Sequence, residues 1–193
     1  MLPSLEAQIE ASVAAVRSLA DQREAVERIA ALVRDTVLRG NLLFTCGNGG
    51  SATDAQHLAE ELVARFRSNR RALPAVALTA DSSVLTCIGN DFGYEQVFAR
   101  QVEALARPGD LLLCFTTSGN SPNILAALRA ARERGAGTVA LLGKDGGAAR
   151  GLADHELIVA SQDTARIQEA HLLVLHYICE AVEEAVLAET RNA

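Results

Sequence analysis

The chain has 193 residues, of which 49% are hydrophobic and 4% aromatic, and its formal net charge is −6. This length fits one domain with a sizeable core, and the composition is typical of an α/β protein rich in Ala, Leu and Val. The negative charge argues against a nucleic-acid-binding surface and against an anionic membrane as partners.

The cysteines and the N-terminus indicate a cellular compartment. Cys46, Cys87, Cys114 and Cys179 are scattered without a C-x-x-C pair, and three of them lie in apolar segments. This usage predicts small buried side chains in a reducing environment. The N-terminus lacks a signal pattern, and no apolar run approaches transmembrane length. We therefore expect a soluble cytoplasmic protein.

Residues 4–39 carry the apolar periodicity of two amphipathic helices, and Gly40 ends the second. Nothing in this region indicates a cofactor. We interpret residues 1–40 as a helical pair used in packing or oligomerisation.

A strand at 42–46 is followed by a Gly-Asn-Gly-Gly-Ser loop at 47–51 and a helix at 52–66. The glycines allow backbone N–H groups to approach a ligand closely. The loop is neither a Walker A motif nor a G-x-G-x-x-G motif, so a dinucleotide fold has little support. Alternatively, Ser51 only caps the helix.

The helix at 52–66 places His57 and Glu61 on one face, four residues apart. Such a pair is commonly a surface ion pair. Here the helix begins at the glycine loop, and ligands of open α/β sheets bind at the ends of the strands. Both interpretations stay open.

Residues 74–78 predict a second strand, followed by a short helix from about residue 84 and a turn-rich break at 89–94. Asn90 and Asp91 lie in this break, where Asp is usually a structural turn residue. A further helix ends before Pro108.

The most informative stretch is a buried strand at 111–115 followed by the hydroxyl-rich loop 116–121. Pro122 then opens a helix that reaches about Gly135, and Ser121 is its predicted N-cap. Hydroxyls and the free N–H groups of a helix start together make an anion site, and phosphate is the usual occupant. The alternative is an ordinary polar loop between a strand and a helix.

Strands at 138–142 and 155–160 precede a last, largely apolar helix at 164–188. Gln168 and His176 lie eight residues apart and share a face of this helix, with His171 near Gln168. A lone histidine there is usually a hydrogen-bonded core residue, but two polar groups on one apolar stripe favour function. The alternation predicts a three-layer αβα fold with a five-stranded parallel sheet in flavodoxin-like order.

Four motifs follow one another in a specific order: GNGGSATDAQHLAEELVARF, TADSSVLTCIGNDFGYEQVF, TTSGNSPN and TARIQEAH. Together they resemble the sugar isomerase (SIS) domain family, in its branch that acts on sedoheptulose 7-phosphate. The resemblance covers nearly the whole chain, so residues 1–193 would form one SIS domain. It implies a homotetramer that converts sedoheptulose 7-phosphate to D-glycero-D-manno-heptose 7-phosphate, for bacterial ADP/GDP-heptose and lipopolysaccharide core synthesis.

The resemblance also implies roles for individual residues. The acid–base pair would be Glu61 and His176, and several members of the family bind zinc at positions matching His57, Glu61, Gln168 and His176. The substrate would contact the two loops and residues near them: Asn48, Gly49, Gly50, Ser51, Glu61, Asn90, Asp91, Thr116, Thr117, Ser118, Ser121 and Gln168. The chain departs from the pattern at Thr116, where serine is frequent, and at Ala165, where some members have aspartate.

The chemistry agrees with these roles. Moving a proton between C1 and C2 through an enediol(ate) needs a base, which we assign to Glu61, and a proton donor, for which His176 is suited. A zinc ligand cannot also be a free base, so the division of roles stays open. Two other interpretations remain: a non-catalytic regulator that binds the bacterial replication initiator, and a sugar-phosphate-sensing module. The joint presence of His57, Glu61, Gln168 and His176 favours the enzyme.

Overall fold

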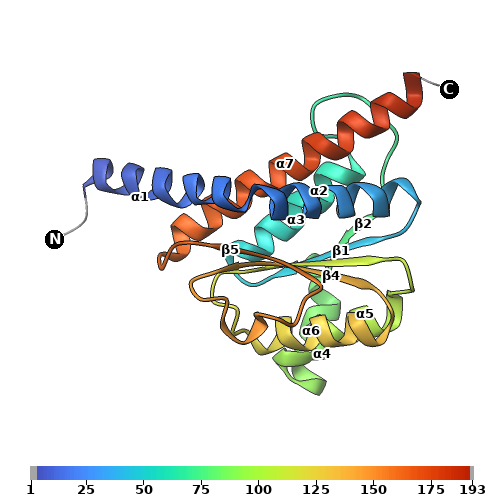
Figure 1. Ribbon diagram of the computed structural model, residues 1–193. Helices are drawn as coiled ribbons and strands as arrows, with labels where there is room; N and C mark the ends of the chain where they lie inside the picture. Colours follow the sequence, from blue (N-terminus) through green and yellow to red (C-terminus); the bar gives the residue numbers. More distant parts are fainter. Residues whose placement is uncertain (1–3, 192–193) are drawn as a thin grey trace.

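The computed structural model describes residues 4–191, which form a parallel sheet covered on both faces by helices (Figure 1). The strands are β1 (Leu43–Gly47), β2 (Ala75–Ala77), β3 (Leu111–Thr116), β4 (Gly137–Gly143) and β5 (His155–Val159), in the order β2-β1-β3-β4-β5. This order is the flavodoxin-like one. The predicted three-layer fold is therefore confirmed.

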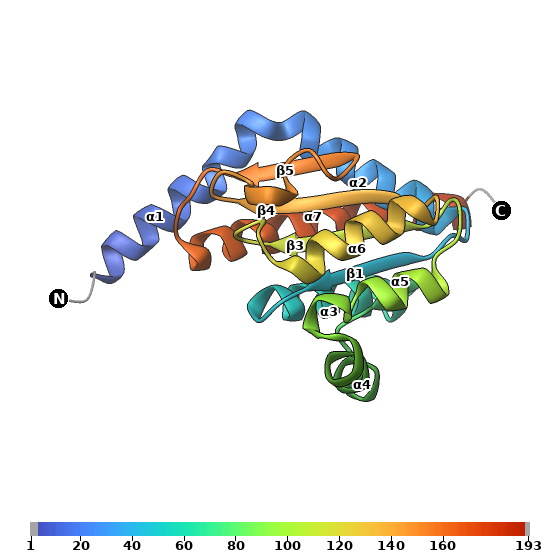
Figure 2. The same ribbon diagram turned by 90° about the horizontal axis from the view of Figure 1, so that it is seen from below.

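The helices divide between the two faces, as Figures 1 and 2 show. One face carries α1 (Leu5–Arg17), α2 (Arg23–Leu38), α3 (Gly50–Val63) and α7 (Thr164–Arg191). The other carries α4 (Ser82–Phe92), α5 (Ala99–Leu105) and α6 (Pro122–Glu133). Short 3₁₀ helices lie at η1 (Ser18–Gln22), η2 (Tyr94–Gln96) and η3 (Gly147–Ala149). Among the helices of residues 4–191, none has the length and apolarity needed to cross a membrane.

The central strands are apolar throughout because both of their faces are buried. Leu111, Leu113 and Phe115 of β3 join the core under α2, α3 and α7. Leu112 and Cys114 point to the opposite core under α5 and α6. Such strands appear in the sequence as short continuous apolar runs, which is why their positions were predictable.

The N-terminal helices pack on this chain's own sheet and on α7. The carboxamide of Gln22 donates to the Ile158 carbonyl (2.7 Å) and accepts from the Ile158 N–H (3.3 Å) at the outer edge of β5. The Arg166 guanidinium donates to the Gln8 carbonyl (2.7 Å) and so ties α1 to α7. Along α1, an apolar stripe remains exposed to solvent: Leu5 (76%), Ile9 (51%) and Val13 (41%).

The turn-rich break predicted at 89–94 is wrong, because Gly89 to Phe92 continue helix α4. The Asp81 carboxylate caps this helix by accepting from the N–H groups of Ser83 and Val84, so the helix begins earlier than expected. The chain turns only at Gly93, where φ is +90°.

His171 is buried at 0% exposure on α7, where its Nε2 lies 3.1 Å from the Leu142 carbonyl and its ring meets the edge of Phe115. Burial lowers the pKa of His171 to about 4, although its hydrogen bond to Leu142 opposes this shift. His171 is therefore a neutral core residue that donates to the end of β4.

This burial makes folding stability depend on pH. The pKa of His171 is about 4 in the folded chain and 6.5 ordinarily, so stability is fully present above pH 6.5 and is lost as the pH falls toward 4. We expect the loss to reach about 3 kcal/mol. The measurement is the free energy of urea unfolding from pH 7.5 to 4 for the parent and for His171→Gln, whose slope should be shallower. Equal slopes for the parent and for His171→Gln would contradict the assignment.

Two helix starts allow a matched comparison of capping. The Asp81 side chain accepts two backbone N–H groups of α4, whereas the Ser121 hydroxyl makes no capping bond to α6 within the described chain. We expect Asp81→Ala to lower the free energy of unfolding by about 1 kcal/mol and Ser121→Ala to change it by less than about 0.5 kcal/mol. Urea unfolding at pH 7 measures both. A loss in Ser121→Ala as large as that in Asp81→Ala would show that its hydroxyl supports the helix.

Candidate active site

A cavity of about 240 Å³ lies at the carboxyl ends of β1 and β3. Cys46 pairs with Cys114 and Gly47 with Phe115 across these parallel strands, so the loops that follow both strands lie side by side. The start of α7 closes the third side. The lining residues are Asn48, Gly49, Gly50, Ser51, Phe115, Thr116, Thr117, Ser118, Ser121, Thr164 and Gln168. These include every predicted substrate-binding residue except Glu61, Asn90 and Asp91.

The loop 116–121 has a fixed shape. The Gly119 N–H donates to the Thr116 hydroxyl (3.2 Å), and the Asn120 N–H donates to the Ser118 hydroxyl (3.2 Å). Gly119 has φ +64°, and a Cβ there would lie 1.9 Å from the Gly146 carbonyl oxygen, so only glycine fits. The loop leads into α6, whose first N–H groups and positive dipole end favour an anion.

The loop 47–51 is shaped by close approach to other segments. A Cβ on Gly50 would lie 2.5 Å from the Gln168 Nε2, so the glycine lets α7 bring its amide into the cavity. A Cβ on Gly47 would lie 2.3 Å from the Ser51 carbonyl oxygen. The glycines thus serve the packing of the site as well as backbone access to a ligand.

His57, Glu61 and His176 gather on α3 and α7. The His57 Nε2 lies 3.2 Å from a Glu61 carboxylate oxygen, and the His57 and His176 rings meet edge to face with centroids 5.2 Å apart. The His176 ring also stacks on Phe66, at 5.8 Å. His57 and Glu61 lie on α3, and His176 comes from α7. The group is therefore not only an ion pair between neighbours on one helix.

Glu60 adds a further carboxylate that sequence reasoning did not assign. Donor atoms of His57, Glu60 and Glu61 all lie within 4.8 Å of one another. Imidazole nitrogen and carboxylate oxygen suit Zn(II), so the residues of this cluster fit a zinc ion. The sequence signal for Glu60 is its position three residues after His57, a spacing that makes the two neighbours on one helix.

Gln168 lies at a different level of the site from His176. Eight residues separate them, which is about 12 Å along an α-helix. Gln168 lines the cavity beside Gly50, while His176 contacts His57. The site therefore extends along α7, with the hydroxyl loop and Gln168 at one end and the histidine–glutamate cluster at the other.

Asn90 and Asp91 lie on α4, exposed to solvent, where the Asn90 amide donates to the Asp91 carboxylate (2.7 Å). In the part of the chain that the structure describes, neither residue lines the cavity. Their contact with the substrate stays a prediction.

Two further polar residues, Asn123, which is buried, and Asp54, which is half-buried, were not assigned from the sequence. Asn123 on α6 exchanges two hydrogen bonds with Asn48. Asp54 on α3 has a carboxylate oxygen that is buried without a hydrogen-bond partner among residues 4–191. Burial raises the pKa of Asp54 to about 6, although the nearby His57 opposes this shift. Asp54 lies three residues before His57 on the same helix, whereas the contact of Asn123 is revealed only by the folded arrangement.

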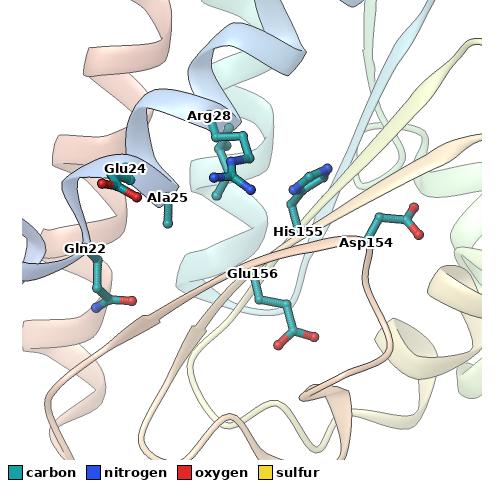
Figure 3. A pocket seen from close by; sticks show the side chains of 8 residues that line it. Gln22, Glu24, Ala25, Arg28, Asp154, His155 and Glu156 are labelled. Atoms are coloured by element: carbon teal, nitrogen blue, oxygen red, sulfur yellow. The ribbon is translucent and has the colours of Figure 1, made fainter.

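A second cavity, of about 420 Å³, lies between α2 and β5 (Figure 3). Arg28 and His155 line it, together with the acidic side chains Glu24, Asp154 and Glu156. Its Gln22 is already hydrogen-bonded to the edge of β5. Opposite charges are mixed here and the hydroxyl loop lies elsewhere, so the cavity at the ends of β1 and β3 is the better ligand site.

Comparisons with known proteins point the same way. Residues 7–143 match the SIS domain family. A phosphoheptose isomerase of Pelobacter propionicus is 55% identical over 83% of this chain and 85% of its own. One of Citrifermentans bemidjiense is 49% identical over 98% of this chain and 99% of its own. The solved structure of a phosphoheptose isomerase from Francisella tularensis has a TM-score of 0.90 at 37% identity and covers 93% of this chain and 96% of that one.

The family model spans both loops and α3, and the likeness to the Citrifermentans bemidjiense protein extends over nearly the whole chain. The family resemblance seen in the four sequence motifs is confirmed. The chain belongs to the SIS domain family and, within it, to the phosphoheptose isomerases.

Proposed function

We propose that this chain catalyses the isomerisation of sedoheptulose 7-phosphate to D-glycero-D-manno-heptose 7-phosphate, which supplies bacterial heptose and lipopolysaccharide core synthesis. One observation carries the proposal. Both the hydroxyl-lined cavity and the cluster of two histidines and a glutamate include residues of helices α3 and α7. This arrangement suits a phosphorylated sugar that extends from one end of the site to the other.

The phosphate binds in the loop 116–121. Thr117, Ser118 and Ser121 offer hydroxyl donors there, and the N–H groups at the start of α6 add the favourable end of a helix dipole. The Ser121 hydroxyl is free for the ligand because, in the described structure, it makes no capping bond. Binding energy from the phosphate, remote from the reacting carbons, positions those carbons for reaction.

The reacting carbons lie toward Glu61 and His176. The Glu61 carboxylate takes the proton from C1 of the ketose, which gives an enediol(ate), and the proton returns to C2 to form the aldose. His176 moves a proton at the substrate oxygens, and its ring is held between His57 and Phe66. Exchange of these two roles gives the same product.

The residues that would hold zinc are His57, Glu61 and His176. Gln168, whose amide lies beside Gly50, would turn toward them to complete the set. A bound zinc ion would polarise the substrate carbonyl or fix the orientation of the acid–base pair. His57 and Glu61 are already in contact, so the chain presents part of this donor set from one helix.

We infer that the protein is a cytoplasmic homotetramer in which residues 1–40 pack between subunits. The exposed stripe of Leu5, Ile9 and Val13 supports this, as does an apolar groove of about 320 Å³ that includes Leu173 and Tyr177 of α7. Such surfaces on a small domain are typical of protein–protein contacts.

The acid–base roles are tested by turnover. We expect Glu61→Gln and His176→Ala to lower kcat for sedoheptulose 7-phosphate by about 10²- to 10⁴-fold, because each removes a group that transfers a proton. Activity should also fall after chelation and return with added zinc. His155→Ala, at the distant second cavity, is the control and should retain the parent's rate.

The proposed reaction would be contradicted if the well-folded parent protein turned over no substrate, with or without zinc. A replication-initiator-binding regulator or a sugar-phosphate sensor would then be the better interpretation.

The tetramer is tested by light scattering of the purified chain. We expect a mass about four times the 20.4 kDa of one chain. Ile9→Asp should yield smaller species because it places a charge on the apolar stripe. Glu10→Gln, on the same helix, should leave the mass unchanged, and an unchanged mass in Ile9→Asp would exclude α1 from the interface.

A further inference from the structure

We propose that Asn123 and Tyr94 are positioning residues that hold the Asn48 carboxamide in one orientation and thereby fix the two ligand loops relative to each other. The inference deepens the proposed function, since it rests on a phosphorylated ligand occupying the cavity that Asn48 lines.

The central contact is a reciprocal pair of amides. The Asn48 Nδ2 donates to the Asn123 Oδ1 (2.8 Å), and the Asn123 Nδ2 donates to the Asn48 Oδ1 (2.8 Å). Asn48 belongs to the loop after β1, and Asn123 lies on α6 two residues after Ser121. The pair therefore joins the loop 47–51 to the helix that the loop 116–121 enters.

Asn123 is only 2% exposed and does not line the cavity. It can therefore hold Asn48 without contacting a ligand itself. A buried carboxamide is costly unless its hydrogen bonds are made, and Asn48 satisfies both ends of this one. Burial thus makes the pair difficult to break, and a break would free both loops.

Tyr94 adds a third bond from outside. Its hydroxyl, on η2, donates to the Asn48 Oδ1 (3.0 Å), although the residue is 63% exposed. The Asn48 oxygen then accepts two bonds, from Tyr94 and from Asn123. The Tyr94 hydroxyl therefore helps to hold the Asn48 carboxamide in place.

One N–H group of the Asn48 carboxamide remains for a ligand. The amide nitrogen has two N–H protons, and one is used by Asn123. The second is available to an oxygen atom in the cavity that Asn48 lines. Asn48 is therefore a single, oriented donor, and its orientation depends on two residues that line no part of that cavity.

The experiment compares the parent with Tyr94→Phe, Asn123→Ala and the double variant. KM and kcat are measured with sedoheptulose 7-phosphate, and Kd for inorganic phosphate by titration calorimetry. We expect Asn123→Ala to raise KM and Kd about tenfold and Tyr94→Phe about threefold, with a smaller effect on kcat. Tyr94→Phe should have little further effect once Asn123 is gone, because both act through one carboxamide.

Asn69→Ala, which removes an exposed carboxamide elsewhere, should behave as the parent. Effects of the two variants that simply multiply would overturn the shared role, as would a lower melting temperature with unchanged KM and Kd. If Asn123→Ala does not fold, Asn123→Ser takes its place. A parent that binds phosphate but turns over no heptose phosphate refutes the proposed reaction and leaves this test intact through Kd. A parent that binds neither overturns both.

Discussion

β1 and β3 run side by side in the same direction, and the site depends on this pairing. Cys46 lies beside Cys114 in the ladder, so the chain leaves both strands at the same edge of the sheet. Both faces of these strands are buried under helices, and polar groups can gather only where the strands end. The glycine loop and the hydroxyl loop thus meet although 65 to 74 residues separate them in the sequence.

α7 connects this edge to the histidine–glutamate cluster, and the surrounding chain keeps the cluster in place. The nearly buried Glu183 carboxylate accepts the N–H groups of Arg67 and Ser68, which anchors the segment carrying Phe66 beneath His176. Arg70 donates to the carbonyls of Glu61 and Leu62 at the end of α3. His57 and Glu61 therefore lie on a helix, α3, whose carboxyl end is itself capped by the Arg70 side chain.

Much of this arrangement could be predicted from the sequence, because its signals are local. Apolar runs mark the buried strands, and Ser121-Pro122 marks a helix start. The topology then brings most of the chosen loop residues into one cavity. The extent of α4 was missed because Gly89, Asn90 and Asp91 resemble a turn, whereas the Asp81 cap and the burial of Ile88 outweigh their weak helix propensity.

Contacts between distant side chains could not be predicted in the same way. The bond of Asn48 to Asn123, the approach of Gln168 to Gly50 and the contact of His176 with His57 have no periodicity in the sequence. Each depends on how helices and loops settle against one another after the strands have paired. Side-chain hydrogen bonds of this kind are specified by the whole fold rather than by any one segment.

Gln22 covers the outer edge of β5, where the sheet ends. Its carboxamide offers β5 one acceptor and one donor, the same groups that a residue of an adjoining strand would offer to Ile158. Unprotected sheet edges can recruit strands from other molecules and seed aggregation. The glutamine acts as a one-residue imitation of a sixth strand, so a side chain from the N-terminal segment terminates the sheet and discourages its growth from molecule to molecule.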